Sequence, residues 1–174
     1  MSLLGCTLTH RSADGIVSVR LTEVEAYAGE ADPASHAWRG RTPRNQVMFG
    51  PAGFLYVYFS YGMHFCGNVV VGKEGQASAV LLRAGEVVDG VELARARRGA
   101  TVRDAALARG PANLMQAMGV DRSHDGAHLL GDGPLVLAPG EPVPANRVRN
   151  SPRGIRRSIL AIRATTENRD PLQS

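Results

Sequence analysis

Every aromatic side chain of this sequence lies in one stretch. The nine Phe, Trp and Tyr residues all fall between Tyr27 and Phe65, and none follows. We expect the phenylalanines Phe49, Phe54 and Phe59 to fill one end of a core. The tyrosines lie among a group of arginines, and the set is Tyr27, Arg39, Arg41, Arg44, Tyr56, Tyr58 and Tyr61. Aromatic faces beside cationic side chains suit a site that holds bases and phosphates.

The chain has 174 residues and a mass of 18.5 kDa, which fits one core, so we treat residues 1–174 as a single domain. Its two cysteines, Cys6 and Cys66, are too few for a disulfide framework. We find neither a leader pattern nor an apolar run long enough for a membrane span. We therefore expect an intracellular, cytoplasmic protein with no membrane partner.

The formal net charge of +4 and the sequence pI near 9.6 favour an acidic partner. A GC-rich coding sequence would produce the same excess of arginine, so the charge alone does not decide the partner. Lys73 is the only lysine in the sequence. A reaction that needs a lysine amine as nucleophile could draw only on Lys73 or the N-terminus.

Residues 15–27 have the alternation of a strand. One face carries apolar residues and then two glutamates and a tyrosine, unless a bulge changes the parity: Val17, Val19, Leu21, Glu23, Glu25 and Tyr27. Two interpretations stay open. Either both glutamates are surface charges where the strand enters solvent, or at least one lines a cleft and acts as a general base.

Residues 28–51 predict a long ordered loop, which in a compact domain is usually functional or disordered, and its Arg, His and Trp content favours function. Residues 54–59 alternate like a strand, and a second apolar run covers residues 63–71. Together the two runs predict a β-hairpin with its turn near residues 60–62. Gly62 permits a positive φ in that turn, and Tyr61 would project from the tip.

Residues 77–84 predict a buried strand that ends at Arg83, whose guanidinium would need a carboxylate or phosphate partner if buried. We expect helices over residues 86–98 and from Pro111 to Gly119, and a short strand over residues 134–137. The arginines of residues 147–157 either contact phosphates or form a solvated face. His124 and His128 are a weak pair of metal ligands, and we expect no metal site.

Several motifs follow one another at fixed places. They are Glu23-Val24-Glu25-Ala26-Tyr27, residues 35–45, residues 55–64 with Asn68, Leu81-Leu82-Arg83-Ala84, and Gly110-Pro111-Ala112-Asn113-Leu114. In this order and at this spacing, they resemble the alkyladenine (3-methyladenine) DNA glycosylase family. The resemblance implies a mixed α/β (α+β) single domain, with a curved antiparallel β-sheet core, a protruding β-hairpin and flanking helices.

The resemblance also implies an activity. Such an enzyme flips alkylated or deaminated purines out of double-stranded DNA and hydrolyses the N-glycosidic bond, which initiates base excision repair. The residues implied are Tyr27, His36, Tyr58 and Asn68 for the base pocket, Tyr61 for intercalation into the DNA stack, and Arg39, Arg41 and Arg44 for the DNA backbone. Asn68 would restrict which purines fit.

By the same resemblance, Glu25 is the general base that activates water, and Arg83 helps to position that water and the carboxylate. Glu23 is less favoured as the base, because the motif places catalysis two residues before Tyr27. The scarcity of lysine favours a monofunctional glycosylase without lyase activity. No cofactor is implied, and a monomer is expected to act on damaged DNA, at the nucleoid if the protein is bacterial. The preferred lesion stays open among 3-methyladenine, 7-methylguanine, hypoxanthine and ethenoadenine.

Two departures from the family pattern concern the ends. The family usually has a helix before the segment that Leu3-Leu4-Gly5 resembles, and Pro171-Leu172-Gln173-Ser174 lacks the aromatic residue of its closing strand. Shortened or divergent ends favour a second hypothesis, a catalytically silent module of the same fold that recognises damage. A carbohydrate glycosidase that uses Glu23 and Glu25 is a third, and it leaves the arginine-rich loop and the tyrosine hairpin without a role.

Overall fold

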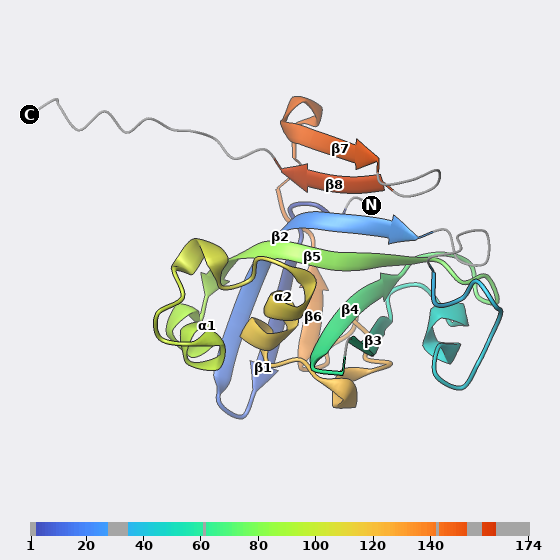
Figure 1. Cartoon of the computed structure of the whole chain (residues 1–174), viewed down its shortest axis with the longest axis horizontal. Coiled ribbons are helices and arrows are strands. Elements are labelled where there is room, and N and C mark those ends of the chain that lie inside the picture. The colour runs from blue at the N-terminus through green and yellow to red at the C-terminus, as the bar shows by residue number, and fades with distance from the viewer. Residues whose placement is uncertain (1–2, 28–34, 61, 142, 153–157, 163–174) are drawn as a thin grey trace, which may run out of the picture.

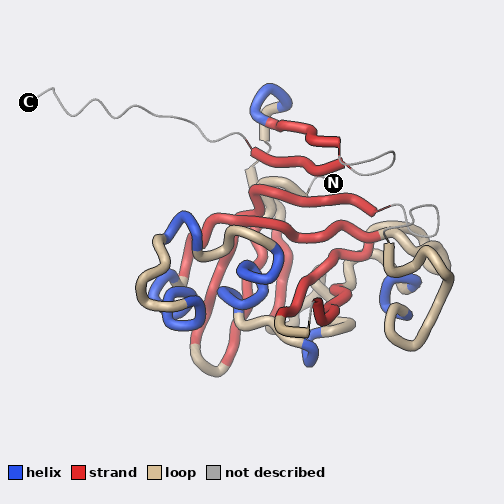
Figure 2. The backbone as a smooth tube through the Cα atoms, viewed as in Figure 1, coloured by secondary structure: helices blue, strands red, loops and turns tan. Residues whose placement is uncertain are grey.

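The computed structural model describes residues 3–27, 35–60, 62–141, 143–152 and 158–162. The strands are β1 (Thr7–Ser12), β2 (Gly15–Tyr27), β3 (Leu55–Ser60), β4 (His64–Val70), β5 (Ala79–Asp89), β6 (Leu135–Ala138), β7 (Val148–Pro152) and β8 (Ser158–Ile162). The helices are α1 (Val91–Arg98) and α2 (Pro111–Met118), with 3-10 turns η2 (Gln46–Phe49), η3 (Asp104–Ala106), η4 (Arg122–His124) and η5 (Ala145–Arg147). Figures 1 and 2 show this mixed α+β arrangement.

The strands form one curved antiparallel sheet in the order β3-β4-β5-β2-β1-β6. Its central strand, β2, pairs with β5 along one side. On the other side, the first half of β2 pairs with β1 and the second half with β8, which also pairs with β7 (Figure 1). The predicted fold class is confirmed, and so is the hairpin, which β3 and β4 form.

The two faces of the sheet carry different cores. Helices α1 and α2 cover one face (Figure 2), over a core that is almost wholly aliphatic. A smaller core on the other face includes Phe49 and Tyr56, with Phe54 packed against it. The aromatic residues therefore do gather at one end, but the expectation for Phe59 is wrong, because 46% of this residue is exposed on the hairpin.

Several boundaries differ from those predicted. The helix expected over residues 86–98 begins only at Val91, because residues 86–89 continue β5 and pair with β2. The helix from Pro111 to Gly119 and the strand near residues 134–137 are confirmed. Strands β1, β7 and β8 were not predicted. The C-terminal segment that departs from the family pattern, residues 171–174, lies outside the described residues.

Of the three irregularities in the pairing of β2 with β5, two compensate each other. Leu21 lies opposite Gly85 and Glu23 opposite Ala84, so Thr22 is an extra residue on β2. Val24 then lies opposite Leu82, so Arg83 is an extra residue on β5. An extra residue switches which face the following side chains occupy. Accordingly, Val24 and Leu82 continue the aliphatic core of Val17, Val19 and Leu21.

None of the helices in the described part of the chain is long and apolar enough to cross a membrane.

A buried histidine ties β1 to α2 and η4. His10 is 4% exposed, and its Nδ1–H donates to the Met118 carbonyl oxygen over 2.8 Å. Its Nε2 is then the acceptor that faces Nε2 of His124, at 3.2 Å. Burial is the largest cause that lowers the pKa of His10, and the charges of His124 and Arg97 lower it further. The hydrogen bond to the Met118 carbonyl and the charge of Asp121 raise the pKa, but they are outweighed. The folded protein therefore holds His10 neutral.

The close approach of β2 and β5 at Gly85 generates a prediction. A Cβ at Gly85 would lie 2.2 Å from Val19 Cγ1 and 2.7 Å from the Arg20 carbonyl oxygen, beside the irregular pairing. Gly85→Ala should therefore lower the free energy of unfolding by about 1–3 kcal/mol, measured by urea denaturation. Gly133→Ala is the matched control, because a Cβ there meets no atom within 4 Å. Equal unfolding midpoints for the two variants would contradict the close approach.

The lowered pKa of His10 predicts loss of stability in acid. As the pH falls below 6.5, the ordinary pKa of histidine, the unfolded chain takes up a proton that folded His10 excludes, so the free energy of unfolding decreases. The limiting slope is about 1.4 kcal/mol per pH unit for one proton. His10→Gln should flatten the decrease without abolishing it, because the pKa of His36 is also lowered. Urea denaturation across this range checks this, and an unchanged slope would be evidence against it.

Candidate active site

Strand register aligns a row of side chains across four strands. Tyr56 on β3 lies opposite Asn68 on β4, Asn68 opposite Leu81 on β5, and Leu81 opposite Glu25 on β2. Directly opposed residues in an antiparallel sheet share a face. In the adjacent row, Tyr58 lies opposite Cys66. These side chains thus occupy the face opposite the helices, with the smaller core.

Of the two interpretations of the glutamates, the structure excludes surface charge for Glu25, which is 3% exposed. The prediction that the glutamates continue the face of Leu21 is wrong, and the bulge that was left open as an alternative is the reason. The irregular pairing gives that face to Val24. Glu23 and Glu25 therefore lie on the opposite face of β2.

Arg83 joins the two glutamates. Its Nε donates to Glu23 Oε1 and its Nη1 to Glu25 Oε2, each over 2.6 Å. The side chain of Glu25 is 4% exposed, that of Glu23 32% and that of Arg83 25%. Burial disfavours the charged guanidinium, but the hydrogen bond and charge of each glutamate outweigh it and raise the pKa of Arg83. The expected partner of this arginine is thus a pair of carboxylates.

A pocket opens beside this cluster, and seven residues line it: Tyr27, Ser35, His36, Met48, Tyr56, Tyr58 and Asn68. His36 Nδ1 lies 3.1 Å from the Tyr56 hydroxyl oxygen, and its ring centroid is 4.4 Å from that of Tyr58. Tyr56 and Tyr58 stack with centroids 5.7 Å apart. The four residues predicted for a base pocket, Tyr27, His36, Tyr58 and Asn68, are therefore brought together, and Glu25 lies two strands from Asn68, across Leu81 of β5.

The pocket is uncharged at neutral pH. Burial lowers the pKa of His36, and the nearby guanidinium of Arg44 lowers it further. Burial also raises the pKa of Tyr56 and of Tyr58 above that of free tyrosine. Neutral aromatic rings of this kind present electron-rich faces, which attract flat cations as well as neutral bases.

Asn45 holds the loop that carries His36. It is 2% exposed, and its Nδ2 donates to the His36 carbonyl oxygen over 2.8 Å and to the Gly40 carbonyl oxygen over 3.0 Å. Its Oδ1 accepts from the Thr42 backbone N–H over 2.6 Å. One buried amide thereby fixes residues 36–42 of the predicted loop, whereas residues 28–34 of that loop lie outside the described residues.

The outer edge of β3 is held by side chains from distant segments. Arg44 donates to the Phe59 carbonyl oxygen over 3.3 Å, and Arg122 donates to that of Val57. Asp125 accepts from the Val57 N–H over 2.8 Å. These contacts satisfy the backbone groups that an edge strand would otherwise leave open, and they brace the hairpin.

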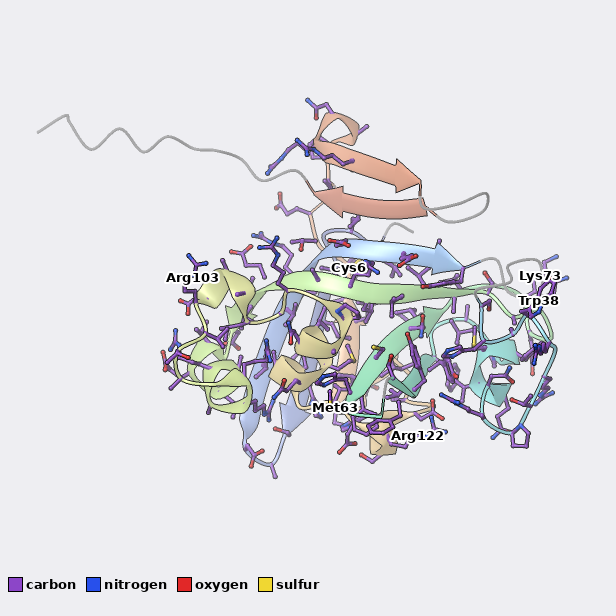
Figure 3. The ribbon with its side chains drawn as sticks, in the orientation of Figure 1. Cys6, Trp38, Met63, Lys73, Arg103 and Arg122 are labelled. Atoms are coloured by element: carbon purple, nitrogen blue, oxygen red, sulfur yellow. The ribbon has the colours of Figure 1, made fainter. Side chains whose placement is uncertain are left out.

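The remaining predicted residues are only partly placed. Tyr61, the predicted wedge, lies outside the described residues, between Ser60 and the exposed residue Gly62. Arg39, Arg41 and Arg44 are all exposed, and Arg44 braces the hairpin as well. Figure 3 shows Met63 and Arg122 at the lower edge of the molecule, whereas Trp38 lies at its right-hand end.

Sequence reasoning missed some residues and separated others. It did not identify the contacts of Arg122 and Asp125 with Val57. These residues are more than sixty positions from Val57 in the sequence, so no local pattern indicates the contacts. His124 and His128 do not face a common site, because His124 contacts His10 and His128 stacks on Phe54. Among the described residues, no group of three or more His, Cys, Asp or Glu is arranged to hold a metal ion.

Comparison with known proteins agrees with this geometry. The model of the family described as methylpurine-DNA glycosylase (MPG) matches residues 1–162. A 3-methyladenine DNA glycosylase of Streptomyces avermitilis is 57% identical over 153 residues, which cover 87% of this chain and 72% of the relative. The relative in Nocardia farcinica is 54% identical, with 87% and 72% covered, and that in Corynebacterium glutamicum is 53% identical, with 77% and 69% covered. This chain therefore belongs to the methylpurine-DNA glycosylase family.

Proposed function

We propose that the protein flips alkylated or deaminated purines out of duplex DNA and hydrolyses their N-glycosidic bond, with Glu25 as the general base. Family membership supports a DNA repair glycosylase, a hydrolase of the base excision pathway. The observation that carries the assignment to Glu25 is its position, buried, held by Arg83 and next to a neutral aromatic pocket.

The chemistry follows from that position. Water attacks C1′ of the sugar, so that a C–O bond forms while the bond from C1′ to the base nitrogen breaks and its electron pair leaves with the base. Glu25 accepts the proton of the water, and its charge stabilises the oxocarbenium-like sugar. Arg83 keeps the carboxylate in one orientation, so that water and C1′ meet without a further search.

The neutral pocket accounts for a preference for damaged purines. An N-alkylated purine is electron-poor or cationic, so it stacks well on Tyr58 and His36 and leaves readily as a neutral base. Asn68 lines the pocket and lies between Tyr56 and Leu81 in the row of paired residues, where its amide limits which exocyclic groups fit. Flipping costs a few kcal/mol, and least for a poorly paired base, which adds to the selection.

We propose that the hairpin enters the DNA minor groove with Tyr61 as the wedge, while Arg39, Arg41 and Arg44 contact the backbone. Phe59 and Met63, which are 46% and 71% exposed, add apolar surface to this hairpin. A monomer suffices for this contact, and its place of action is the DNA inside the cell. Lys73, in the turn between β4 and β5, is exposed and is not among the residues that line the pocket, which supports a reaction that ends at hydrolysis without a lyase step.

Glu25→Gln should abolish base release while leaving recognition intact. The expected decrease in the single-turnover rate is about 10²–10⁴-fold, because the amide cannot accept the proton of water. Base release is measured from a duplex that carries one 3-methyladenine or hypoxanthine, and binding is measured on the same duplex.

Glu86→Gln is the matched control for Glu25→Gln, because Glu86 forms an exposed pair with Arg20 outside the pocket. Equal release by the parent protein and Glu25→Gln would contradict the proposed role. Damage-selective binding without release by the folded parent would instead support the catalytically silent module.

The bracing of β3 generates a second expectation. Arg122→Ala removes the donor to the Val57 carbonyl oxygen, so the hairpin should insert less effectively and the single-turnover rate should fall about 3- to 10-fold. Arg103→Ala is the control, because it removes an exposed positive charge on the far side of the molecule (Figure 3). Equal rates for the two variants would mean that Arg122 acts through charge alone or has no role.

A further inference from the structure

The second carboxylate on Arg83 has no role in the reaction described so far. Glu23 accepts a hydrogen bond from Nε of Arg83 over 2.6 Å. Because Nε carries a single proton, this bond uses its only donor. Glu25 accepts a hydrogen bond from Nη1 of the same guanidinium, also over 2.6 Å. The two contacts together fix the plane of the guanidinium.

The irregular pairing of β2 with β5 builds this arrangement. Because Arg83 is an extra residue on β5, no residue of β2 lies directly opposite it. Its side chain instead reaches two residues of β2 that share a face, Glu23 and Glu25. Bulges often re-aim a side chain next to an active site in this way.

The contacts of the three groups point to a function for the pair. A guanidinium paired with Glu25 alone could still turn about its side-chain bonds. A second carboxylate, at Nε, restricts that freedom. Glu23 is also more exposed than Glu25, so the desolvation cost of its charge is smaller than that of the charge on Glu25.

We propose that Glu23 is a positioning residue for the glycosylase reaction, which holds Arg83 through Nε and so sets the orientation of Glu25. This inference rests on the proposed role of Glu25. It differs from a role for Glu23 as the base itself, because Glu23 acts through Arg83 and does not touch the reacting atoms.

The other titratable groups around the cluster are neutral near pH 7. Cys66 on β4 faces Arg83, and burial raises the pKa of its thiol. Tyr58 on β3, with its raised pKa, lies against Cys66 and near Tyr27 of β2. His36, from the loop over the pocket, has a lowered pKa. Among the described side chains, the charge next to Glu25 is therefore set by Arg83 and Glu23.

The test measures the single-turnover rate and the binding of a duplex with one hypoxanthine, for the parent, Glu23→Gln, Glu23→Asp, Glu25→Gln and the control Glu86→Gln. Glu23→Gln should lower the rate about 10- to 100-fold with binding unchanged. Glu23→Asp keeps the carboxylate but shortens its reach, so it should lower the rate less.

The outcomes separate this inference from the proposed function. If Glu25→Gln is inactive but Glu23→Gln keeps the parent's rate, the role of Glu23 is overturned and the base stands. If Glu25→Gln remains active, the proposed function itself fails. Should Glu23→Gln not fold, Glu23→Asp decides the matter, since a rate equal to that of the parent overturns the inference.

Discussion

The site depends on the paired irregularity between β2 and β5. An extra residue on each strand, Thr22 and Arg83, lets the strands keep their pairing while the side chains beyond change faces. Without that change, Glu23 and Glu25 would follow Leu21 into an aliphatic core, where unpaired carboxylates are very costly. With it, the carboxylates and Arg83 meet on the pocket face, and Val24 and Leu82 complete the core behind them.

The groups around the cluster of Glu23, Arg83 and Glu25 differ in their charge and their contacts. A neutral pocket of Tyr56, Tyr58 and His36 suits a flat, electron-poor base, while the charged groups lie beside it on the adjoining strands. The arginines have two kinds of contact. Arg83 binds the two glutamates, whereas Arg44 and Arg122 brace the edge strand β3 of the hairpin. The proposed functions of base binding and hydrolysis thus fall to distinct groups, which lets each be tested by itself.

Much of this was predictable from the sequence. Alternation and the Gly62 turn gave the β3–β4 hairpin, and the resemblance of the motifs assembled Tyr27, His36, Tyr58 and Asn68 into what the structure shows as one pocket. The face of Glu25 was not predictable, since a bulge depends on pairing between β2 and β5 rather than on either strand's own pattern. For the same reason, residues 86–89 were taken for a helix, although pairing with β2 makes them strand.

The most direct test is a crystal structure of the protein bound to a duplex that carries an uncleavable analogue of a damaged purine nucleotide. We expect the purine to lie against Tyr58 and His36, with a water between Glu25 and C1′ at about 3–3.5 Å from that carbon. A purine that stays stacked in the duplex, or one that is flipped with Glu25 turned away from C1′ and Arg83 detached from both carboxylates, would contradict it.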